Sequence, residues 1–175
     1  MYGFPESHAA SFALLVYVSA WLKCHYPDVF ICALLNAQPM GFYAPAQLIA
    51  EAKQNNIAIR SVDVNFSGWD HRLESDPDNR KGHHALRLGL RLVKGLARGE
   101  GERIAASQTS DGGKQTGLNF SSLDDVMRKA DVSAKSLQAI ADADGFTSLA
   151  IDRRQALWVA RGLARHRLHD MPLFA

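Results

Sequence analysis

The fold class follows from one stretch, Leu92-Val93-Lys94-Gly95-Leu96-Ala97-Arg98-Gly99-Glu100-Gly101-Glu102-Arg103-Ile104. It predicts a tight turn followed by a helix over residues 95–106. Glycines in such a turn let backbone N–H groups approach a phosphate, and the N-terminus of the helix adds partial positive charge. Residues 81–104 carry six Lys or Arg against two Asp or Glu, in keeping with a phosphate-contacting surface. The alternative is an ordinary glycine-containing connection whose charges are solvated.

The rest of the chain is predicted to be helical on both sides of a small β patch. Helices are expected over residues 8–23, 27–35, 45–53, 123–130, 134–143 and 152–166, with caps at Ser7, Ser121-Ser122 and Ser133. Alternating residues predict short strands at 57–59 and 62–64, and a hairpin with arms at 69–73 and 85–88. The polar residues 74–82 predict an exposed loop between the arms. The fold class is therefore mostly α with a small β-hairpin patch.

The N-terminal stretch predicts a capped and almost entirely apolar helix, Tyr2-Gly3-Phe4-Pro5-Glu6-Ser7-His8-Ala9-Ala10-Ser11-Phe12-Ala13-Leu14-Leu15. A helix this apolar requires partners on most of its sides. Its apolar run over residues 12–22 is too short to span a membrane. The run also lacks the basic flank and the cleavage site of a signal peptide.

The composition is that of a soluble globular protein of 175 residues, 47% of them hydrophobic, with a net charge of +2. Residues 1–80 hold five Lys or Arg against eight Asp or Glu, whereas residues 81–175 hold fifteen against ten. A polyanionic partner is therefore expected to meet the second half of the chain. Cys24 and Cys32 lie eight residues apart in predicted helices, and we expect reduced core thiols of a cytoplasmic protein.

Other functional classes find little support in the sequence. No Ser-His-Asp signature, Walker loop or dinucleotide fingerprint occurs. His83 and His84 could suggest a metal, but adjacent strand residues face opposite sides and no Cys or carboxylate has ligand spacing to them. No metal site is expected on these grounds.

Four segments resemble the alpha subunit of bacterial C-family DNA polymerases, the DNA polymerase III family, and they occur in that family's order. Residues 4–12 are similar to the error-prone branch, with Pro5-Glu6 where the replicative branch has an Asn-Lys pair. Residues 92–104 resemble the first hairpin of a helix-hairpin-helix domain, with Ala97 at the second glycine of that pattern. Residues 133–149 resemble the partner hairpin, and residues 151–158 resemble the turn into the last helix.

The resemblance implies a fragment with four parts. These are the end of the polymerase fingers (1–56), a β patch or connector (57–92), a helix-hairpin-helix DNA-binding domain (93–166) and a tail (167–175). The domain is implied to hold duplex or primed DNA by its backbone, without reading the sequence. The implied DNA-binding residues are Lys94, Gly95, Leu96, Arg98, Gly99 and, as a secondary contact, Lys135.

The implied whole protein is an error-prone DNA-directed DNA polymerase, a cytoplasmic nucleotidyltransferase of translesion synthesis, DNA repair and replication. In this family the palm aspartates hold Mg²⁺, and the resemblance places them upstream of this sequence. No catalytic residue, metal ligand or cofactor is therefore assigned to the chain, and the isolated fragment is expected to be inactive.

The tail, Leu168-His169-Asp170-Met171-Pro172-Leu173-Phe174, is similar to the hexapeptide motif that binds the bacterial sliding clamp, with His169 in place of its leading Gln. Met171, Leu173 and Phe174 would fill a hydrophobic pocket of the clamp. The alternative is that Phe174 folds back on its own domain. A second functional hypothesis therefore makes the chain a protein-interaction module that recruits the sliding clamp or an accessory translesion polymerase subunit.

Overall fold

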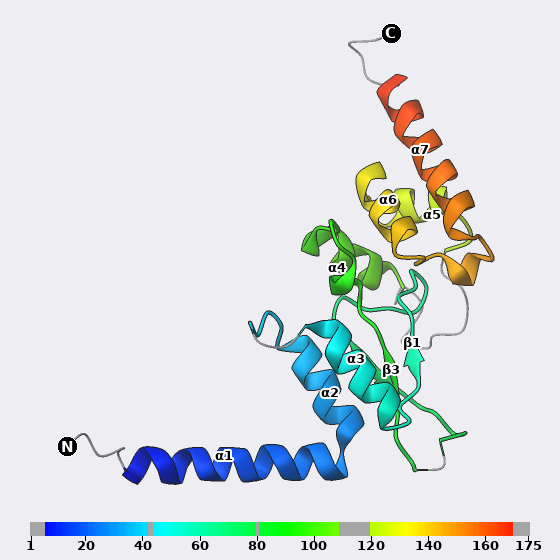
Figure 1. The fold of residues 1–175 in the computed structure, drawn as a ribbon. Helices are drawn as coiled ribbons and strands as arrows, with labels where there is room; N and C mark the ends of the chain where they lie inside the picture. The colour runs from blue at the N-terminus through cyan, green and yellow to red at the C-terminus, as the bar shows by residue number, and fades with distance from the viewer. Residues whose placement is uncertain (1–5, 42–43, 80, 109–119, 170–175) are drawn as a thin grey trace. The chain divides into compact units, whose positions relative to one another are not determined.

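The computed structural model describes residues 6–41, 44–79, 81–108 and 120–169 (Figure 1). The chain divides into two compact units, each made of two stretches of sequence. Unit 1 comprises Met1–Ile59 and Leu73–Leu86, and unit 2 comprises Arg60–Arg72 and Arg87–Ala175. Helices dominate and one small sheet is present, which confirms the predicted fold class.

Unit 1 is built on three helices, α1 (Glu6–His25), α2 (Pro27–Asn36) and α3 (Pro45–Gln54). A proline at the first position of α2 and of α3 suits a helix start, because the missing N–H would have no partner there. α2 packs against both α1 and α3. The buried apolar side chains of this unit include Ile31, Leu35, Leu48, Ala52 and Ile57. All three helices confirm the predicted ones to within two residues at each end.

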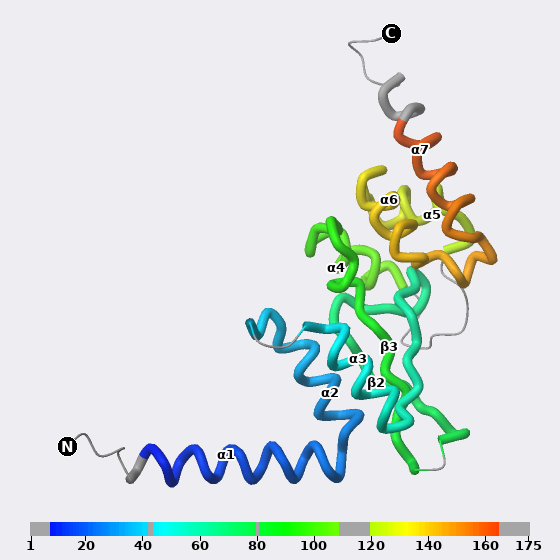
Figure 2. The backbone as a smooth tube through the Cα atoms, in the orientation of Figure 1, coloured from blue at the N-terminus to red at the C-terminus, as the bar shows by residue number. Residues whose placement is uncertain are grey.

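α1 leaves its apolar side chains uncovered, in contrast to the expectation of partners on most sides. Every residue from 8 to 26 is exposed, with Leu14 at 65% and Tyr17 at 69% of full exposure. Figure 2 shows α1 running away from α2 and α3 along most of its length. Within the described part of the chain, no helix is long and apolar enough to cross a membrane.

The two cysteines differ in environment. Cys32 is a buried thiol of α2, as expected, whereas Cys24 lies on the exposed surface of α1 and is not a core residue. Both are free thiols.

The sheet has three short strands, β1 (Ile59–Arg60), β2 (Arg72–Glu74) and β3 (Ala85–Arg87), in the order β1-β3-β2. β2 and β3 are neighbours, which confirms the predicted hairpin. The prediction of a strand at residues 62–64 was wrong, since the backbone there is irregular. Val62, Asp63 and Val64 are all buried, so the alternation of residue types does not reflect one buried and one exposed face.

Unit 2 contains the remaining elements. They are the 3₁₀ turns η1 (Leu90–Leu92) and η2 (Thr147–Leu149) and the helices α4 (Arg98–Ser107), α5 (Leu123–Lys129), α6 (Ala134–Asp142) and α7 (Arg153–His169). Ser122 and Ser133 act as the predicted N-caps, accepting backbone N–H groups at 3.1 and 3.2 Å. The largest fully buried side chains of this core include Leu90, Ile104, Phe120, Leu123, Leu137, Ile140 and Phe146. The two 3₁₀ turns were not predicted.

A buried polar network holds distant parts of unit 2 together. The Asp63 carboxylate accepts the N–H groups of Asn65 and Ser148, each at 2.8 Å. The Asn65 side chain donates to Ser148 Oγ at 2.9 Å and to the Phe120 carbonyl at 3.1 Å, and it accepts the Phe120 N–H at 2.8 Å. Buried polar atoms need such partners, so this segment is fixed by residues far along the chain.

Candidate nucleic-acid interface

The turn before α4 is formed by residues 93–96. The Leu96 N–H donates to the Val93 carbonyl at 3.2 Å, and Gly95 adopts a φ of +91°. A four-residue turn with positive φ at its third position favours glycine, because other residues are strained there. Lys94 and Gly95 are exposed at the tip, whereas the Leu96 side chain is buried in the core. The turn therefore presents its backbone while Leu96 anchors it.

The N-terminus of α4 follows directly and has no side-chain cap. Ala97 occupies the N-cap position with an extended backbone, and its carbonyl accepts the N–H groups of Glu100 and Gly101. The N–H groups of Arg98 and Gly99 precede the first acceptor that the helix can offer, so they have no partner within it. Residues 97–99 are exposed. Together with Lys94, these N–H groups form a positive surface suited to an anion.

Arg98 is the second cation of this surface, and it is held by a neighbour on its own helix. Its side chain is 74% exposed and its Nε donates to Glu102 Oε1 at 2.7 Å. An exposed pair of this kind contributes little to stability, so the guanidinium can exchange this carboxylate for a phosphate at small cost.

Within unit 2, α4 packs against Trp69 through Gly101. A Cβ at position 101 would come within 2.5 Å of Trp69 Cε3 and 2.7 Å of Cζ3. A side chain would therefore collide with the ring, and glycine allows α4 to lie directly on it. This contact sets the position of the exposed turn relative to the core.

Glu100 connects α4 to the start of α6. Its carboxylate accepts the Ser133 N–H at 2.6 Å and the hydroxyl of Ser136. Burial raises the pKa of Glu100, but the hydrogen bonds from Ser136 and Ser133 outweigh it, and the pKa lies below its ordinary value. The carboxylate therefore stays charged at neutral pH and holds the two hairpin segments together.

Arg103 connects α4 to the end of α5. Its Nε donates to the Ala130 carbonyl at 3.0 Å and its Nη2 to the Asp131 carbonyl at 2.7 Å. A shallow pocket of about 260 Å³ beside this contact is lined by Arg103, Ala106, Ser107, Lys129, Ala130 and Asp131. Because Arg103 hydrogen-bonds the carbonyl groups at the C-terminal end of α5, we assign it a structural role and do not propose that it binds a ligand.

The second hairpin follows α6 and packs inward. Asp144 adopts a φ of +57°, and the Gly145 N–H donates to the Ile140 carbonyl at 2.9 Å. A Cβ on Gly145 would lie 2.7 Å from Ile140 Cγ2, so the position has no room for a side chain. Phe146 is buried in the core. Lys135 is exposed in the first turn of α6, in the same unit as the first hairpin.

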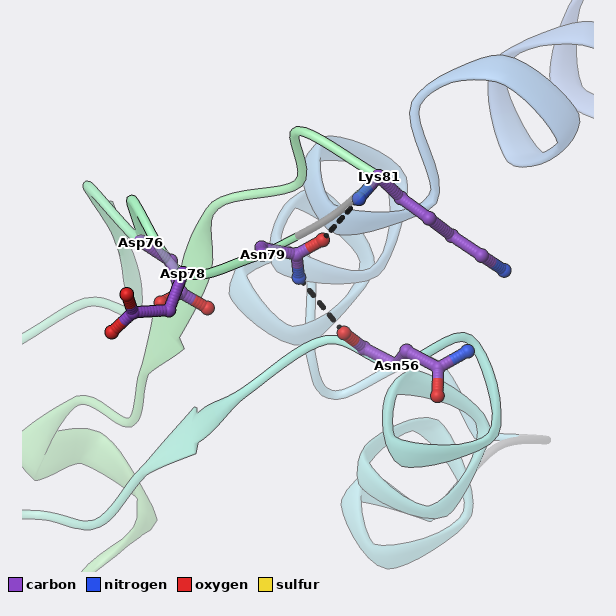
Figure 3. A pocket seen from close by; sticks show the side chains of 5 residues that line it. All are labelled: Asn56, Asp76, Asp78, Asn79 and Lys81. Carbon is purple, nitrogen blue, oxygen red and sulfur yellow. Dashed lines mark hydrogen bonds between the residues drawn. The ribbon is translucent and has the colours of Figure 1, made fainter.

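A separate pocket of about 460 Å³ lies in unit 1, lined by Asn56, Asp76, Asp78, Asn79 and Lys81. Figure 3 shows the Asn79 amide between two backbone groups, accepting the Lys81 N–H at 2.9 Å and donating to the Asn56 carbonyl at 2.9 Å. The Asp76 and Asp78 carboxylates point to one side and the Lys81 ammonium to another. The charged groups do not converge, so we assign no ligand to this pocket.

The histidine pair meets a carboxylate that sequence reasoning missed. His84 donates its backbone N–H to Asp28 Oδ2 at 2.8 Å and its ring Nδ1 lies 2.9 Å from the same oxygen, while His83 Nδ1 lies 3.9 Å from Oδ1. Burial raises the pKa of Asp28, but the hydrogen bonds from His84 bring it below its ordinary value. Among the described residues, no three His, Cys, Asp or Glu side chains form a group that could hold a metal ion.

The residues predicted to bind the sliding clamp, Met171, Leu173 and Phe174, lie outside the described residues.

Comparison with known proteins places these features in a family. The profile described as "Helix-hairpin-helix motif" matches residues 56–156. A protein of Brucella abortus named "Error-prone DNA polymerase" is 48% identical over 173 residues, which is 99% of this chain and 15% of that protein. Proteins named "Error-prone DNA polymerase 2" from Rhizobium meliloti and Agrobacterium fabrum are 48% and 49% identical, over 99% of this chain and 15% of each relative. The chain spans about 15% of the length of these curated relatives.

Proposed function

The chain belongs to the helix-hairpin-helix family and is homologous to part of bacterial error-prone DNA polymerases, and from this premise we propose that it grips the backbone of duplex DNA for such a polymerase. The observation that carries the proposal is the exposed turn and uncapped helix N-terminus at residues 94–99. Helix N-termini and nearby cations bind phosphates through N–H groups and charge. Contacts of this kind carry little base information, so the binding is expected to be independent of sequence.

Each residue of the turn has a distinct role in this proposal. Lys94 and Arg98 neutralise phosphates, while the backbone at Gly95 and Gly99 comes closest to the DNA. Leu96 acts from the core by anchoring the turn, because its side chain is buried and its N–H already donates to Val93. Lys135 adds a secondary phosphate contact from the first turn of α6.

For the whole protein we propose error-prone, DNA-directed DNA synthesis, as the names of the relatives suggest. We also propose a cytoplasmic location and a role in translesion repair and replication, which rest on the resemblance of the sequence to the C-family polymerases. Nucleotidyl transfer of this kind uses two metal ions that stabilise the attacking and leaving oxygens. From the resemblance of the sequence to the C-family polymerases, we propose that Mg²⁺ and the catalytic aspartates belong to other parts of the polymerase. Labelled nucleotide incorporation by the purified 175-residue chain on a primed template would refute this assignment.

The salt dependence of DNA binding tests the grip. We expect fluorescence anisotropy on a labelled primed duplex to show binding that weakens steeply with salt. If Lys94 and Arg98 each contact a phosphate, the double change Lys94→Ala and Arg98→Ala should reduce the slope of log K against log salt by about 1.8. The matched control, Lys81→Ala with Arg128→Ala, removes the same charge from exposed positions elsewhere and should change the slope far less. Equal slopes for the two double variants would contradict the assignment.

A second proposed role is recruitment of the sliding clamp or an accessory polymerase subunit by Met171, Leu173 and Phe174. It is supported by the apolar residues of the tail and their similarity to the clamp-binding motif. Deletion of residues 171–175 should abolish clamp binding in a pull-down and leave duplex binding unchanged. Retained clamp binding after the deletion would exclude this role.

A further inference from the structure

The helix α7 carries an exposed aromatic side chain between two arginines on its outer face. Trp158 is 72% exposed. Arg154 and Arg161 stand four residues before it and three residues after it, a spacing that places all three on one face of a helix. Ala156 and Ala160, on the opposite face, are buried in the core of unit 2. The tryptophan is therefore turned away from the core and contributes its ring to the surface.

The charge of α7 is of one sign. The helix contains five arginines and two histidines and no Asp or Glu. Arg153 pairs with Asp142 of α6 at 3.2 Å. Among the described side chains, none forms an ion pair with Arg154 or Arg161. These two guanidinium groups are available to an anion on either side of the exposed ring.

The helix carries a glycine beside Trp158. Gly162 lies four residues after it on the same face, and among the described residues a Cβ there would meet no atom within 4 Å apart from the nearby backbone of its own helix. Glycine inside a helix costs roughly 1 kcal/mol relative to alanine, and here no close contact requires it. The ring therefore has no side chain beside it at position 162.

We propose that the outer face of α7 binds single-stranded DNA, with one base stacked on Trp158 and the flanking phosphates held by Arg154 and Arg161. The two arginines are separated by about 10 Å along the helix axis, from seven residues at 1.5 Å each. A base between them can lie on the ring while the phosphates on its two sides reach the guanidinium groups. Aromatic platforms flanked by cations bind single strands in this way, without sequence preference.

The chemistry of the face favours a nucleic acid over a protein partner. A protein hot spot places its tryptophan among apolar neighbours that exclude water. Here the described neighbours three or four residues away on the same face are Arg154, Gln155, Arg161 and Gly162, so none of them is an apolar side chain of the kind that surrounds a protein hot spot. A single strand fits better than a duplex, because its base faces are not already stacked on one another. The inference goes beyond the proposed duplex grip and uses different residues and a different form of DNA.

Affinity for an oligo(dT) of about 16 nucleotides tests the proposed stacking. With the full 175-residue chain, we expect Trp158→Ala to weaken binding about 5-fold to 150-fold, the loss of one base–aromatic stack, and Trp158→Phe to weaken it much less. Trp21→Ala is the matched control, since it removes another exposed tryptophan from α1 and should leave the affinity unchanged. Circular dichroism melting verifies that each variant is folded.

The phosphate contacts are tested by salt titration of the same complex. Arg154→Gln with Arg161→Gln should reduce the slope of log K against log salt by about 1.4, whereas Arg128→Gln should change it by much less than half of that. The inference is overturned if Trp158→Ala binds oligo(dT) as tightly as the unchanged chain. It is also overturned if polyglutamate quenches Trp158 fluorescence as strongly as oligo(dT) at equal charge.

The two proposals fail independently. Lys94→Ala with Arg98→Ala should weaken duplex binding and leave Trp158-dependent binding of oligo(dT) intact. Loss of that oligo(dT) binding in the hairpin variant would overturn the assignment of the single strand to α7. Absence of duplex binding by the unchanged chain, with Trp158-dependent oligo(dT) binding present, would instead refute the duplex grip alone.

Discussion

Replacement of Gly101 by alanine tests whether α4 is held on the Trp69 ring. The added Cβ would lie 2.5 Å and 2.7 Å from two ring carbons and 3.5 Å from Leu96 Cδ2. Because the first two distances are far below van der Waals contact, α4 or the ring must shift. The natural reference is Gly99→Ala, two residues earlier in the same helix. Its Cβ would meet only Arg103 Nη1, at 3.8 Å.

The magnitude follows from two opposing effects. Overpacking of a core by one methyl group costs about 1–3 kcal/mol, and alanine recovers up to about 1 kcal/mol over glycine in a helix. Since the second effect is common to both variants, Gly101→Ala should be about 1–3 kcal/mol less stable than Gly99→Ala. For a chain of this size the difference corresponds to about 2–12 °C in Tm.

Urea unfolding followed by circular dichroism, with tryptophan fluorescence as a second probe, measures the difference. DNA binding supplies the complementary readout. A Cβ at Gly99 would lie on the exposed N-terminus of α4, where the proposed close approach of a phosphate requires a small residue. Gly99→Ala should therefore weaken duplex binding without loss of stability, and Gly101→Ala should lose stability first. Equal unfolding free energies for the two variants would refute the account of how α4 is positioned.

Three further predictions concern polar groups that are buried or half-buried. Burial lowers the pKa of His71 from 6.5 to about 4. Between pH 6.5 and pH 4, the His71 side chain is therefore protonated in the unfolded chain but stays neutral in the folded chain. Stability present above pH 6.5 should then decrease by about 3 kcal/mol across this window, and urea titrations of His71→Gln should lack that loss. Glu100→Gln should destabilise unit 2 by about 1–3 kcal/mol, while Glu102→Gln, on the exposed surface, should change the unfolding free energy by less than about 1 kcal/mol; equal losses would contradict the link from α4 to α6. Asp28→Ala should cost about 1–3 kcal/mol by chemical denaturation, because it leaves two donors of His84 without their acceptor.

The elements with local signals could be predicted from the sequence. Pro27 and Pro45 mark helix starts, and Ser122 and Ser133 cap α5 and α6 where expected. A proline or a capping serine acts on residues three or four positions away, so the local sequence is sufficient to predict where these helices begin. The turn at residues 93–96 was predicted for the same reason, since its glycine conformation is a local property.

The parts that depend on distant partners could not be predicted. The alternation at residues 62–64 is typical of a strand. Asp63 is nevertheless buried, and its carboxylate is satisfied by the N–H group of Ser148, 85 residues away. Nothing in the spacing of charges reveals that Glu100 accepts from Ser133 and Ser136, or that Asp28 meets His84. The outer face of α7 did have a signal, an arginine four residues before and three residues after a tryptophan in a helix without acidic residues. Whether that tryptophan is a core residue or a surface residue depends on which face of α7 is buried, and only the structure shows which face that is.

The bonds of Asp63 and Asn65 to Ser148 have a consequence during synthesis of the protein. At about 5–20 residues per second, Ser148 follows Asp63 out of the ribosome by about 4–17 s. During that interval the segment holding Asp63 and Asn65 lacks its partners, so the core of unit 2 cannot close around it. The N-terminal helices can form within this time from their own local signals. Unit 2 is therefore the last part of the chain to assemble, and a ribosome that stalls before residue 148 would present it unfinished to the proteolytic machinery of the cell.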